Sequence, residues 1–466
     1  MTQAAARIFI SHSTQDARFV DALVERLRDH YLATWYAPRH MPGGYFKEGL
    51  EKALNNCDWF LIVLSPAAIA SEWVKWELEA AMADPRFNGK VIPVLAAPCD
   101  WQSLHAHLKR YQLFDFVAQP KEAESRLLVH LGVTPHIFPP LMVGDVKMPV
   151  HVFVGGDGMT RFRQGDILCD GPGLPDDESR LYSLPLDVQT FAAEYLPKRQ
   201  AECDAQGKLF VNNRQVRLNG VTWGSSNSSG GMANKPLRLS LGWTWYFHTA
   251  VTNARTDQRL PEGHTIGQAY GAPIDNLHDC RLSNPMAANL SVITSDNQIC
   301  LVQRGQRTAI LAGGFQPAVS GDGQPEDLSQ DGTYDPFHTA IREAKEECLG
   351  LLPDDRIQDV CFFGLGRWMK TRFPFLFGEI RVNATAKQLL SFTPPHPDGE
   401  RFFIPFTVES VTAWISQRYQ DMYFGRSSWP VASPIFSLLQ SLRYQYPDRW
   451  LEVVERLDLP EIPPPS

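Results

Sequence analysis

The sequence has few cysteines, no long apolar run and no excess of positive charge, and each shortage excludes a class of protein. Its 8 cysteines form no Cys-x-x-Cys pair, so we expect neither a disulfide framework nor a zinc site. The longest apolar stretches are strand-sized, and the first residues lack the pattern of a signal peptide. A net charge of −8 argues against binding to DNA or to an anionic membrane. We therefore expect a cytoplasmic protein with no membrane partner.

The first 133 residues alternate short apolar runs with helical patterns. The runs that predict strands lie at 7–11, 33–36, 58–65, 90–96 and 114–116. Strand–helix alternation of this kind predicts an α/β domain with a doubly wound parallel sheet. In such sheets, ligands bind in the crevice at the carboxyl ends of the strands.

The rest of the chain shows no regular alternation of helices and strands. The proline-rich stretch 134–149 predicts a linker. We expect residues 150–287 to be β-rich, and the sequence does not indicate whether they belong to a sensor or to an oligomerisation unit. A further domain is expected over 288–458, followed by a disordered tail at 459–466.

One carboxylate stands out in the predicted helix 70–82, ASEWVKWELEAAM. At about 100° per residue, Val74 marks the buried stripe, and Trp73 and Glu77 lie together at its border as an i, i+4 pair. Ser71 can cap the start of this helix. For the helix alone, a packed Trp beside a partly solvated Glu is the simpler interpretation. The functional alternative is a carboxylate and an indole at the mouth of a cleft.

Residues 5–131 resemble the TIR domain family, in particular its bacterial branch. The resemblance rests on the opening FISHSTQD, the loop RHMPGG, LSP at the end of the third run, and a Ser-x-Trp-x-x-x-Glu element from Ser71 to Glu77. Many relatives have Cys after the Trp, where this chain has Val74. That position faces the core, so we expect no effect on the chemistry. The resemblance implies a flavodoxin-like fold over residues 1–133.

TIR domains of two kinds are known, and the resemblance leaves both open. Some only assemble signalling partners, whereas others cleave NAD+ at the nicotinamide–ribose bond. In the enzymes the Glu of this element is catalytic, which places that role at Glu77; adaptor-type domains commonly lack it. The resemblance puts substrate contacts at Trp73, His12, Ser13, Arg39, Gly44 and Phe46. Taken alone, His12 would be an ordinary loop histidine.

The chemistry of NAD+ cleavage suits a single carboxylate without a cofactor. Nicotinamide is already a cationic pyridinium in NAD+, so it leaves without needing a proton. The ribose develops oxocarbenium charge as the bond breaks, and a nearby carboxylate can stabilise that charge. Sites of this kind are generally completed by a neighbouring protomer, which implies self-association into an oligomer or a filament.

A second pattern lies at 335–351, DPFHTAIREAKEECLGL, which predicts a helix. Glu343, Glu346 and Glu347 fall on one face at i, i+3 and i+4. Three carboxylates so placed can hold Mg2+ at a pyrophosphate, or they can form a solvated acidic stripe.

Together with Arg342 and Gly350, these glutamates resemble the second half of the Nudix box. The first half departs from the family, because the spacing between Gly314 and Arg342 is longer and Tyr334 stands where the family has Glu. The resemblance implies a β-rich, α+β Nudix-like domain in which Arg342, Glu343, Glu346 and Glu347 contact a nucleotide. Divergent relatives bind nucleotides without hydrolysing them, and some accompany the nucleotidyltransferases of anti-phage systems.

The segment GLGRWMKTRF at 364–373 adds cations and aromatic rings near that domain. Arg367, Lys370 and Arg372 beside Trp368 would suit phosphates and stacked bases. They would equally suit a strand with one solvent-exposed face.

These features imply an NAD+ hydrolase that acts in anti-phage defence. A nucleotide second messenger, such as a cyclic oligonucleotide, would bind the Nudix-like domain and cause oligomerisation. Two alternatives stay open: a Mg2+-dependent Nudix pyrophosphohydrolase acting on ADP-ribose or a related nucleotide, and a non-catalytic TIR scaffold.

Overall fold

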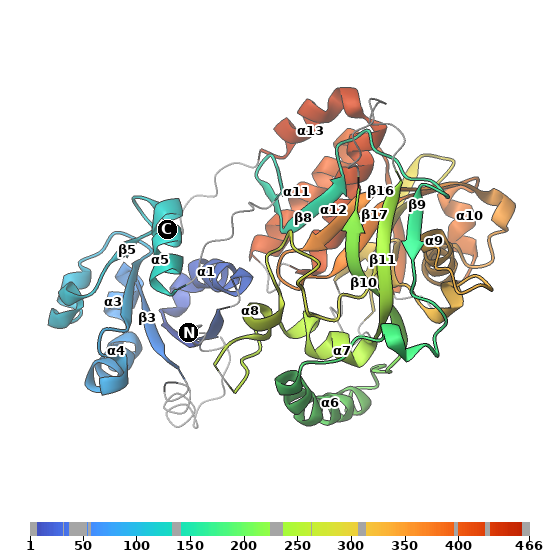
Figure 1. Cartoon of the computed structure of the whole chain (residues 1–466). Coiled ribbons are helices and arrows are strands. Elements are labelled where there is room, and N and C mark those ends of the chain that lie inside the picture. Colours follow the sequence, from blue (N-terminus) through green and yellow to red (C-terminus); the bar gives the residue numbers. More distant parts are fainter. Residues whose placement is uncertain are drawn as a thin grey trace, which may run out of the picture. The chain divides into compact units, whose positions relative to one another are not determined.

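In the structure, a computed structural model, the chain folds into two compact units, shown in Figure 1. It describes residues 7–30, 32–36, 54, 57–132, 141–223, 236–261, 263–305, 314–395, 399–424 and 429–458. The first unit comprises residues 1–137 and 255–270, and the second comprises residues 138–254 and 271–466. None of the helices in the described ranges combines the length and the apolar character needed to cross a membrane.

The first unit is built on a five-stranded parallel sheet in the order β2-β1-β3-β4-β5, which confirms the predicted doubly wound sheet. The strands are β1 (Arg7–Ser11), β2 (Ala33–Tyr36), β3 (Trp59–Leu64), β4 (Val91–Leu95) and β5 (Phe114–Asp115). The helices are α1 (Ala17–Asp29), α3 (Pro66–Ala70), α4 (Glu72–Ala83), α5 (Pro120–His130) and the short α8 (Ile266–Tyr270). Because β1 pairs with both β2 and β3, the strand order reverses between β1 and β3, where ligands bind in such folds.

Both faces of this sheet are buried, as the continuous apolar runs predict. Along β1, Ile8 and Ile10 pack on one face, in the core cluster that contains residues of α1 and α5. Phe9 lies on the other face, in the cluster that contains Val74 and Leu78 of α4. Helix α4 is therefore held directly over the sheet, close to the carboxyl end of β1.

The second unit contains a mixed sheet of eight strands in the order β14-β13-β12-β17-β16-β8, with β15 beside β12 and β18 beside β13. The strands are β8 (Val150–Gly155), β12 (Ala287–Ile293), β13 (Gln298–Arg304), β14 (Phe315–Pro317), β15 (Val319–Asp322), β16 (Ile357–Trp368), β17 (Pro374–Val382) and β18 (Gly399–Pro405). Most neighbours run antiparallel, whereas β12 and β17 are parallel.

Helices pack on both faces of this sheet. Helix α12 (Trp429–Gln445) contributes Phe436 to the core on one face, and α9 (Pro336–Ala344) contributes Phe337 to the core on the other. Helix α9 continues into a single π-helical turn, Lys345–Leu349. The remaining helices around the sheet are α10 (Ala386–Ser391), α11 (Val408–Phe424) and α13 (Trp450–Arg456).

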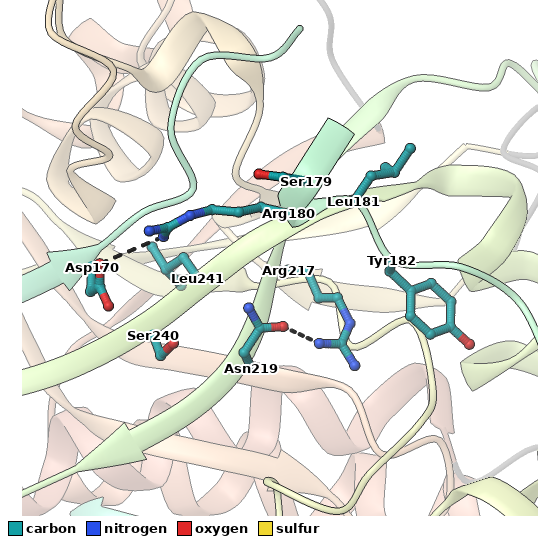
Figure 2. Close-up of a pocket in the computed structure, with 9 residues that line it drawn as sticks. All are labelled: Asp170, Ser179, Arg180, Leu181, Tyr182, Arg217, Asn219, Ser240 and Leu241. Carbon is teal, nitrogen blue, oxygen red and sulfur yellow. Dashed lines mark hydrogen bonds and ion pairs between the residues drawn. The ribbon is translucent and has the colours of Figure 1, made fainter. Parts of the chain in front are cut away.

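A smaller sheet in the second unit has the order β10-β11-β9. Its strands are β9 (Ile167–Asp170), β10 (Arg214–Thr222) and β11 (Leu237–Trp245), accompanied by the helices α6 (Leu186–Ala205) and α7 (Tyr246–Val251). Val216 and Leu218 of β10 pack into the same core as α9. Arg217 and Asn219, which alternate with them, line a cavity of about 390 Å³, drawn in Figure 2.

The structure differs from the expected organisation in two places. The stretch 134–149 is not only a linker, because β6 (Leu141–Val143) and β7 (Val146–Met148) form a hairpin within it. Val143, Val146 and Met148 of this hairpin are buried in the core with α12, although the neighbouring prolines hide the strand pattern. Residues 150–287 contain the strands β8 to β11, but β8 pairs with β16 of the domain expected over 288–458, and α6 is a helix of 20 residues. The tail 459–466 lies outside the described residues.

Candidate active site

Glu77 of α4 lies inside the first unit, at the carboxyl end of β1. Only 3% of the residue is exposed. Its carboxylate accepts a hydrogen bond of 2.5 Å from the hydroxyl group of Ser11, the last residue of β1. The helical periodicity predicts a border position, whereas the structure buries Glu77 because Ser11 offers it a polar partner at the end of the strand.

The start of α4 fixes the position of this carboxylate along the helix. The hydroxyl group of Ser71 accepts a hydrogen bond of 3.3 Å from the backbone N–H of Val74, so the predicted cap is confirmed. Val74, Leu78 and Ala81 are buried against the sheet, and Glu77 is buried with them. The helix therefore carries an acidic side chain in an otherwise apolar face.

Trp73 lies one helical turn before Glu77 and connects it to the surface. The residue is 37% exposed, and its ring stacks on that of Trp76 with the centroids 5.5 Å apart. Its side chain also forms a hydrogen bond with Glu77. Ser11 and Trp73 thus contact the same buried carboxylate from a strand end and from the helix surface.

Burial raises the pKa of Glu77 from an ordinary value of 4.5 to about 7, although hydrogen bonds from Ser11 and Trp73 oppose the shift. The desolvated anion costs free energy, so the group holds its proton up to neutral pH. A cation that arrived beside the carboxylate would favour the ionised form. Such a group suits a ligand that carries, or develops, positive charge.

The loops that follow β1 and β3 are tied together beside this carboxylate. Ser65, directly after β3, donates a hydrogen bond of 2.7 Å to the carboxylate of Asp16, which follows β1. Ser13 is buried and caps the turn Thr14–Asp16, and His12 is half-buried with its ring Nδ1 3.4 Å from the carbonyl oxygen of Ile10. Both residues follow Ser11 directly, so they lie at the same sheet edge as Glu77.

Three expected substrate contacts lie outside the described residues: Arg39, Gly44 and Phe46. The structure also shows a contact that the sequence did not predict, between Ser11 and Glu77. The available signal was a small hydroxyl residue at the end of a buried strand, which commonly faces the ligand crevice in this sheet topology.

Residues 8–129 match the family model of the TIR domain. This part of the chain is a TIR domain. A curated relative of it is the 2′ cyclic ADP-D-ribose synthase BtTIR of Bacteroides thetaiotaomicron, which is 28% identical over 86 residues. The match covers 18% of this chain and 30% of that enzyme, so the chain spans less than a third of its relative's length.

Two solved structures also match parts of the chain. The TIR domain of the Toll-related receptor TRR-2 from Hydra magnipapillata is 20% identical, with a TM-score of 0.23, over 26% of this chain and 94% of its own. The protein DR0079 from Deinococcus radiodurans is 18% identical, with a TM-score of 0.21, over 28% of this chain and 73% of its own.

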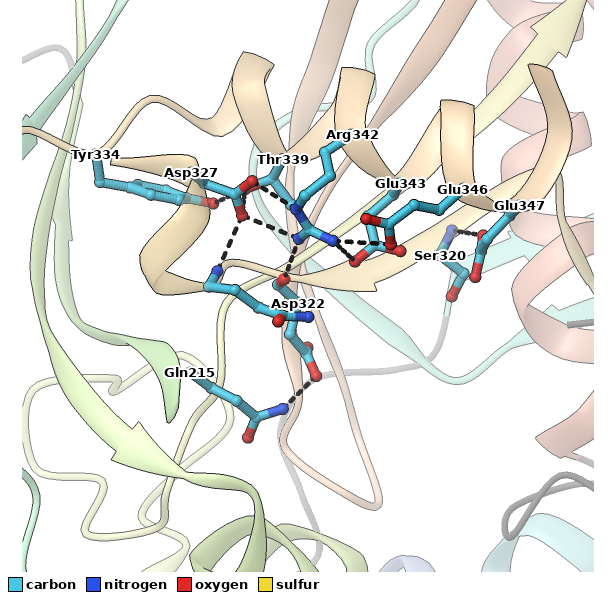
Figure 3. A network of polar contacts seen from close by, with 11 residues as sticks. Gln215, Ser320, Asp322, Asp327, Tyr334, Thr339, Arg342, Glu343, Glu346 and Glu347 are labelled. Carbon is cyan, nitrogen blue, oxygen red and sulfur yellow. Dashed lines mark hydrogen bonds and ion pairs between the residues drawn. The ribbon is translucent and has the colours of Figure 1, made fainter. Parts of the chain in front are cut away.

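The acidic helix of the second unit is organised around Arg342, as Figure 3 shows. The guanidinium group donates to both carboxylate oxygens of Asp327, at 2.7 and 3.0 Å. It also donates to Glu343 at 2.8 Å and to Glu346 at 3.2 Å. Burial raises the pKa of Glu343 to about 7, against the opposing charge of Arg342. The glutamates are therefore not a solvated stripe, because an internal arginine lies among them.

The carboxylates that we expected around Mg2+ do not converge on one point. Glu343 and Glu346 both bond to Arg342, whereas Glu347 accepts a hydrogen bond of 3.0 Å from the backbone N–H of Ser320. Across the described part of the chain, no three His, Cys, Asp or Glu side chains are grouped to hold a metal ion. The donor set does not fit Mg2+, since the guanidinium group already supplies the positive charge.

Tyr334, which stands where the Nudix family has a glutamate, belongs to the same network. It is buried, and its hydroxyl group lies 2.9 Å from that of Thr339. Thr339 in turn donates a hydrogen bond of 2.8 Å to Asp327. A phenol therefore takes part in holding Asp327, and no carboxylate stands at this position.

Arg367, Trp368 and Arg372, which we expected to contact a ligand, are buried. Arg367 donates a hydrogen bond of 2.9 Å to the carbonyl oxygen of Arg372. Trp368 stacks on Phe375 with the centroids 4.9 Å apart. These residues lie inside because β16 has a neighbouring strand on each side and apolar cores on both faces. Lys370, in the turn after β16, is half-buried.

Proposed function

We propose that the TIR domain hydrolyses NAD+ at the nicotinamide–ribose bond, with Glu77 as the catalytic residue. The observation that carries the proposal is the desolvated carboxylate held by Ser11 at the crevice of a doubly wound sheet. Its raised pKa shows that the ionised form is unfavourable in the empty site, and a cationic substrate would stabilise that form. The related enzyme from Bacteroides, named as a 2′ cyclic ADP-D-ribose synthase, supports NAD+ as the substrate class.

In this mechanism the N-glycosidic bond breaks and its electron pair goes to the nicotinamide nitrogen. Nicotinamide therefore leaves as a neutral molecule, and the positive charge passes to the ribose ring. Glu77 stabilises this oxocarbenium charge most strongly in the transition state, where the charge is developing in a site of low dielectric. Water then adds its hydroxyl group to the ribose carbon and releases a proton, which gives ADP-ribose. Capture by a ribose hydroxyl would instead give a cyclic product.

Substrate reaches Glu77 beside the exposed edge of Trp73 in this proposal. The indole offers a flat apolar surface for the nicotinamide ring, and His12 and Ser13 form the adjoining wall after β1. Arg39, Gly44 and Phe46 remain proposed contacts by resemblance. Ser11 acts as a positioning residue, because it holds the carboxylate and favours its ionised form.

We also propose that the second unit binds a nucleotide second messenger and that the chains then associate, so that a neighbouring copy completes the TIR site. The sequence resemblance to divergent Nudix-like sensors supports this arrangement. Loss of NAD+ in an infected cell would make the protein an anti-phage effector. Pyrophosphate hydrolysis is not part of the proposal, since the carboxylates of α9 and its π turn bond to Arg342 and Ser320.

The direct test incubates the purified full chain with NAD+, alone and with each member of a panel of nucleotides. Separation of the products should show nicotinamide and an ADP-ribose product in equal amounts. Mass spectrometry in 18O-labelled water then distinguishes hydrolysis, which incorporates the label, from cyclisation, which does not. Intact NAD+ under every condition that assembles the protein would contradict the proposal and favour the scaffold alternative.

A further inference from the structure

The cavity of about 390 Å³ in the second unit has the composition of an anion-binding pocket (Figure 2). Its lining includes two arginines, Arg180 and Arg217, and hydroxyl groups from Ser179 and Ser240. Asp170 is its single carboxylate. Two guanidinium groups and one carboxylate leave a positive balance, in a chain whose formal net charge is −8. Its volume is typical of sites for small ligands.

The floor of this pocket is the outer face of β10 and β11. Val216 and Leu218 of β10 are buried in the apolar core. Because successive side chains of a strand point to opposite faces, Arg217 and Asn219 point away from that core and into the pocket. One N–H of the Arg217 guanidinium group donates to the amide oxygen of Asn219. The strand therefore places the cation and the amide side by side, at a point where the register between β10 and β11 shifts between Leu218 and Gly220.

Arg217 is held by neutral groups. Its Nη2 donates to the carbonyl oxygens of Cys280 and Leu282, at 3.3 and 3.1 Å, and its guanidinium group lies 4.9 Å from the ring centre of Tyr182. Among the described residues, no carboxylate lies within ion-pair distance of it. Burial lowers the pKa of Arg217, and the nearby Arg367 guanidinium lowers it further. This half-buried charge lacks a counter-charge, which an anionic ligand would supply.

The rim is formed by the turn Glu178–Arg180, which lies close to the floor. A β-carbon on Gly242 of β11 would lie 2.7 Å from the carbonyl oxygen of Arg180 and 2.9 Å from the amide nitrogen of Asn219. The rim can approach the floor because residue 242 has no side chain. The guanidinium group of Arg180 forms an ion pair of 3.5 Å with the exposed Asp170. Hydrogen bonds from Ser179, and also the charge of Arg180, lower the pKa of Asp177. The Arg180 side chain is 42% exposed, so it is accessible to a ligand.

We propose that this pocket binds the phosphate groups of a nucleotide, and that it is the place where the second unit receives its signal. The regulatory part rests on the proposed function, whereas the binding part does not. Arginine suits phosphate because its planar group donates two parallel hydrogen bonds to two oxygen atoms. The hydroxyl groups of Ser179 and Ser240 provide further donors. The acidic network around Arg342, in contrast, would repel a phosphate.

The test measures binding to the full chain by isothermal titration calorimetry with four probes: inorganic pyrophosphate, AMP, cyclic di-AMP and uncharged adenosine. The phosphate-bearing probes should bind, more weakly as salt is raised, and adenosine should not. Arg217→Gln and Arg180→Gln should each weaken binding roughly 10- to 100-fold. Arg163→Gln, which removes the same charge from an exposed arginine of the same unit, should leave the affinity unchanged.

Asp170→Asn provides a test of opposite sign, because loss of the only carboxylate in the lining should tighten the binding of phosphate. A misfolded variant could not give that result. The proposal is overturned if no phosphate-bearing probe binds, if adenosine binds as tightly as AMP, or if Arg217→Gln and Asp170→Asn both leave the affinity unchanged.

Nicotinamide release from NAD+, measured in the same samples, separates this proposal from the function of the TIR domain. If phosphate binding depends on Arg217 but no nicotinamide is released, the result supports the phosphate-binding pocket and contradicts the proposed NAD+ cleavage. If a nucleotide stimulates nicotinamide release equally in the Arg217→Gln chain and the unmodified chain, the result supports NAD+ cleavage and contradicts the regulatory role of the pocket.

Discussion

Ser11 donates a hydrogen bond of 2.5 Å to Glu77, and this contact ties the end of β1 to the middle of α4. It joins residues that are 66 positions apart in the sequence. The bond stabilises a carboxylate that burial would otherwise keep protonated. The proposed chemistry therefore depends on the balance between desolvation and this donor, which pH and mutation can both change.

The rate of NAD+ cleavage should rise with pH, because only ionised Glu77 can stabilise the ribose cation. The pKa of about 7 places the midpoint of kcat/KM near neutral pH. In the complex the cationic nicotinamide favours the anion, so the midpoint of kcat should lie at lower pH. Initial rates of nicotinamide release between pH 5 and pH 9 would show both. A flat profile over this range would contradict the assignment of Glu77.

Ser11→Ala should shift the midpoint of kcat/KM to higher pH, by on the order of one unit, because the anion loses a hydrogen bond from a buried donor. Ser11→Thr keeps a hydroxyl group and should restore most of the original profile. If Ser11→Ala lowered the rate equally at every pH, the serine would have only a structural role.

Glu77→Gln should stabilise the first unit at high pH. A carboxyl group whose pKa is raised in the folded state binds more protons folded than unfolded between its two pKa values. The free energy of unfolding therefore decreases as pH rises from 4.5 to about 7. Glutamine does not ionise, so the variant does not lose this stability as pH rises. Compared with the unmodified chain, it should be more stable by about 3 kcal/mol at pH 8 and equally stable at pH 4.

The measurement is a urea titration at each pH, with hydrogen exchange of peptides from β1 and α4 reporting on the first unit. Glu79→Gln makes the same chemical change at an exposed position of the same helix and should have little effect at either pH. A Glu77→Gln chain that was less stable at pH 8 would show instead that the ionised carboxylate stabilises the fold.

Arg342→Met should destabilise the second unit by about 3–5 kcal/mol, because it leaves the buried carboxylate of Asp327 without its positively charged partner. Arg342→Lys should cost less, since it keeps one charge but loses the bidentate geometry. Arg163→Met is the exposed control. Urea titrations followed through peptides of β12 and β17 would measure the loss. An unchanged midpoint for Arg342→Met would mean that the network is not structural.

The sequence predicts the TIR domain well because its signals are local. Continuous apolar runs locate the buried strands, and Ser71 locates the start of α4. The depth of Glu77 could not be predicted in the same way, because its partner Ser11 is brought to it only by the tertiary fold. A helical wheel measures the direction of a side chain around its own axis and contains no information about what lies beneath the helix.

In the second unit, sequence patterns did not predict which charged side chains are exposed to solvent. The cations and rings of 364–373 suggest a ligand surface, yet Arg367 and Trp368 are buried because β16 lies within the sheet. The acidic residues at 343–347 suggest a solvated stripe or a metal site, whereas Arg342 forms ion pairs with Glu343 and Glu346. The pocket at Arg217 gave no motif at all, since its residues come from separate segments of the chain.

The most direct test compares nicotinamide release by the Glu77→Gln and Glu79→Gln chains under the condition that activates the unmodified protein. We predict that Glu77→Gln lowers the rate roughly 100- to 1,000-fold, while Glu79→Gln leaves it unchanged. Calorimetry with the same nucleotide probes confirms that both chains still respond to ligand. Equal rates of nicotinamide release from the two variants would contradict the catalytic role of Glu77.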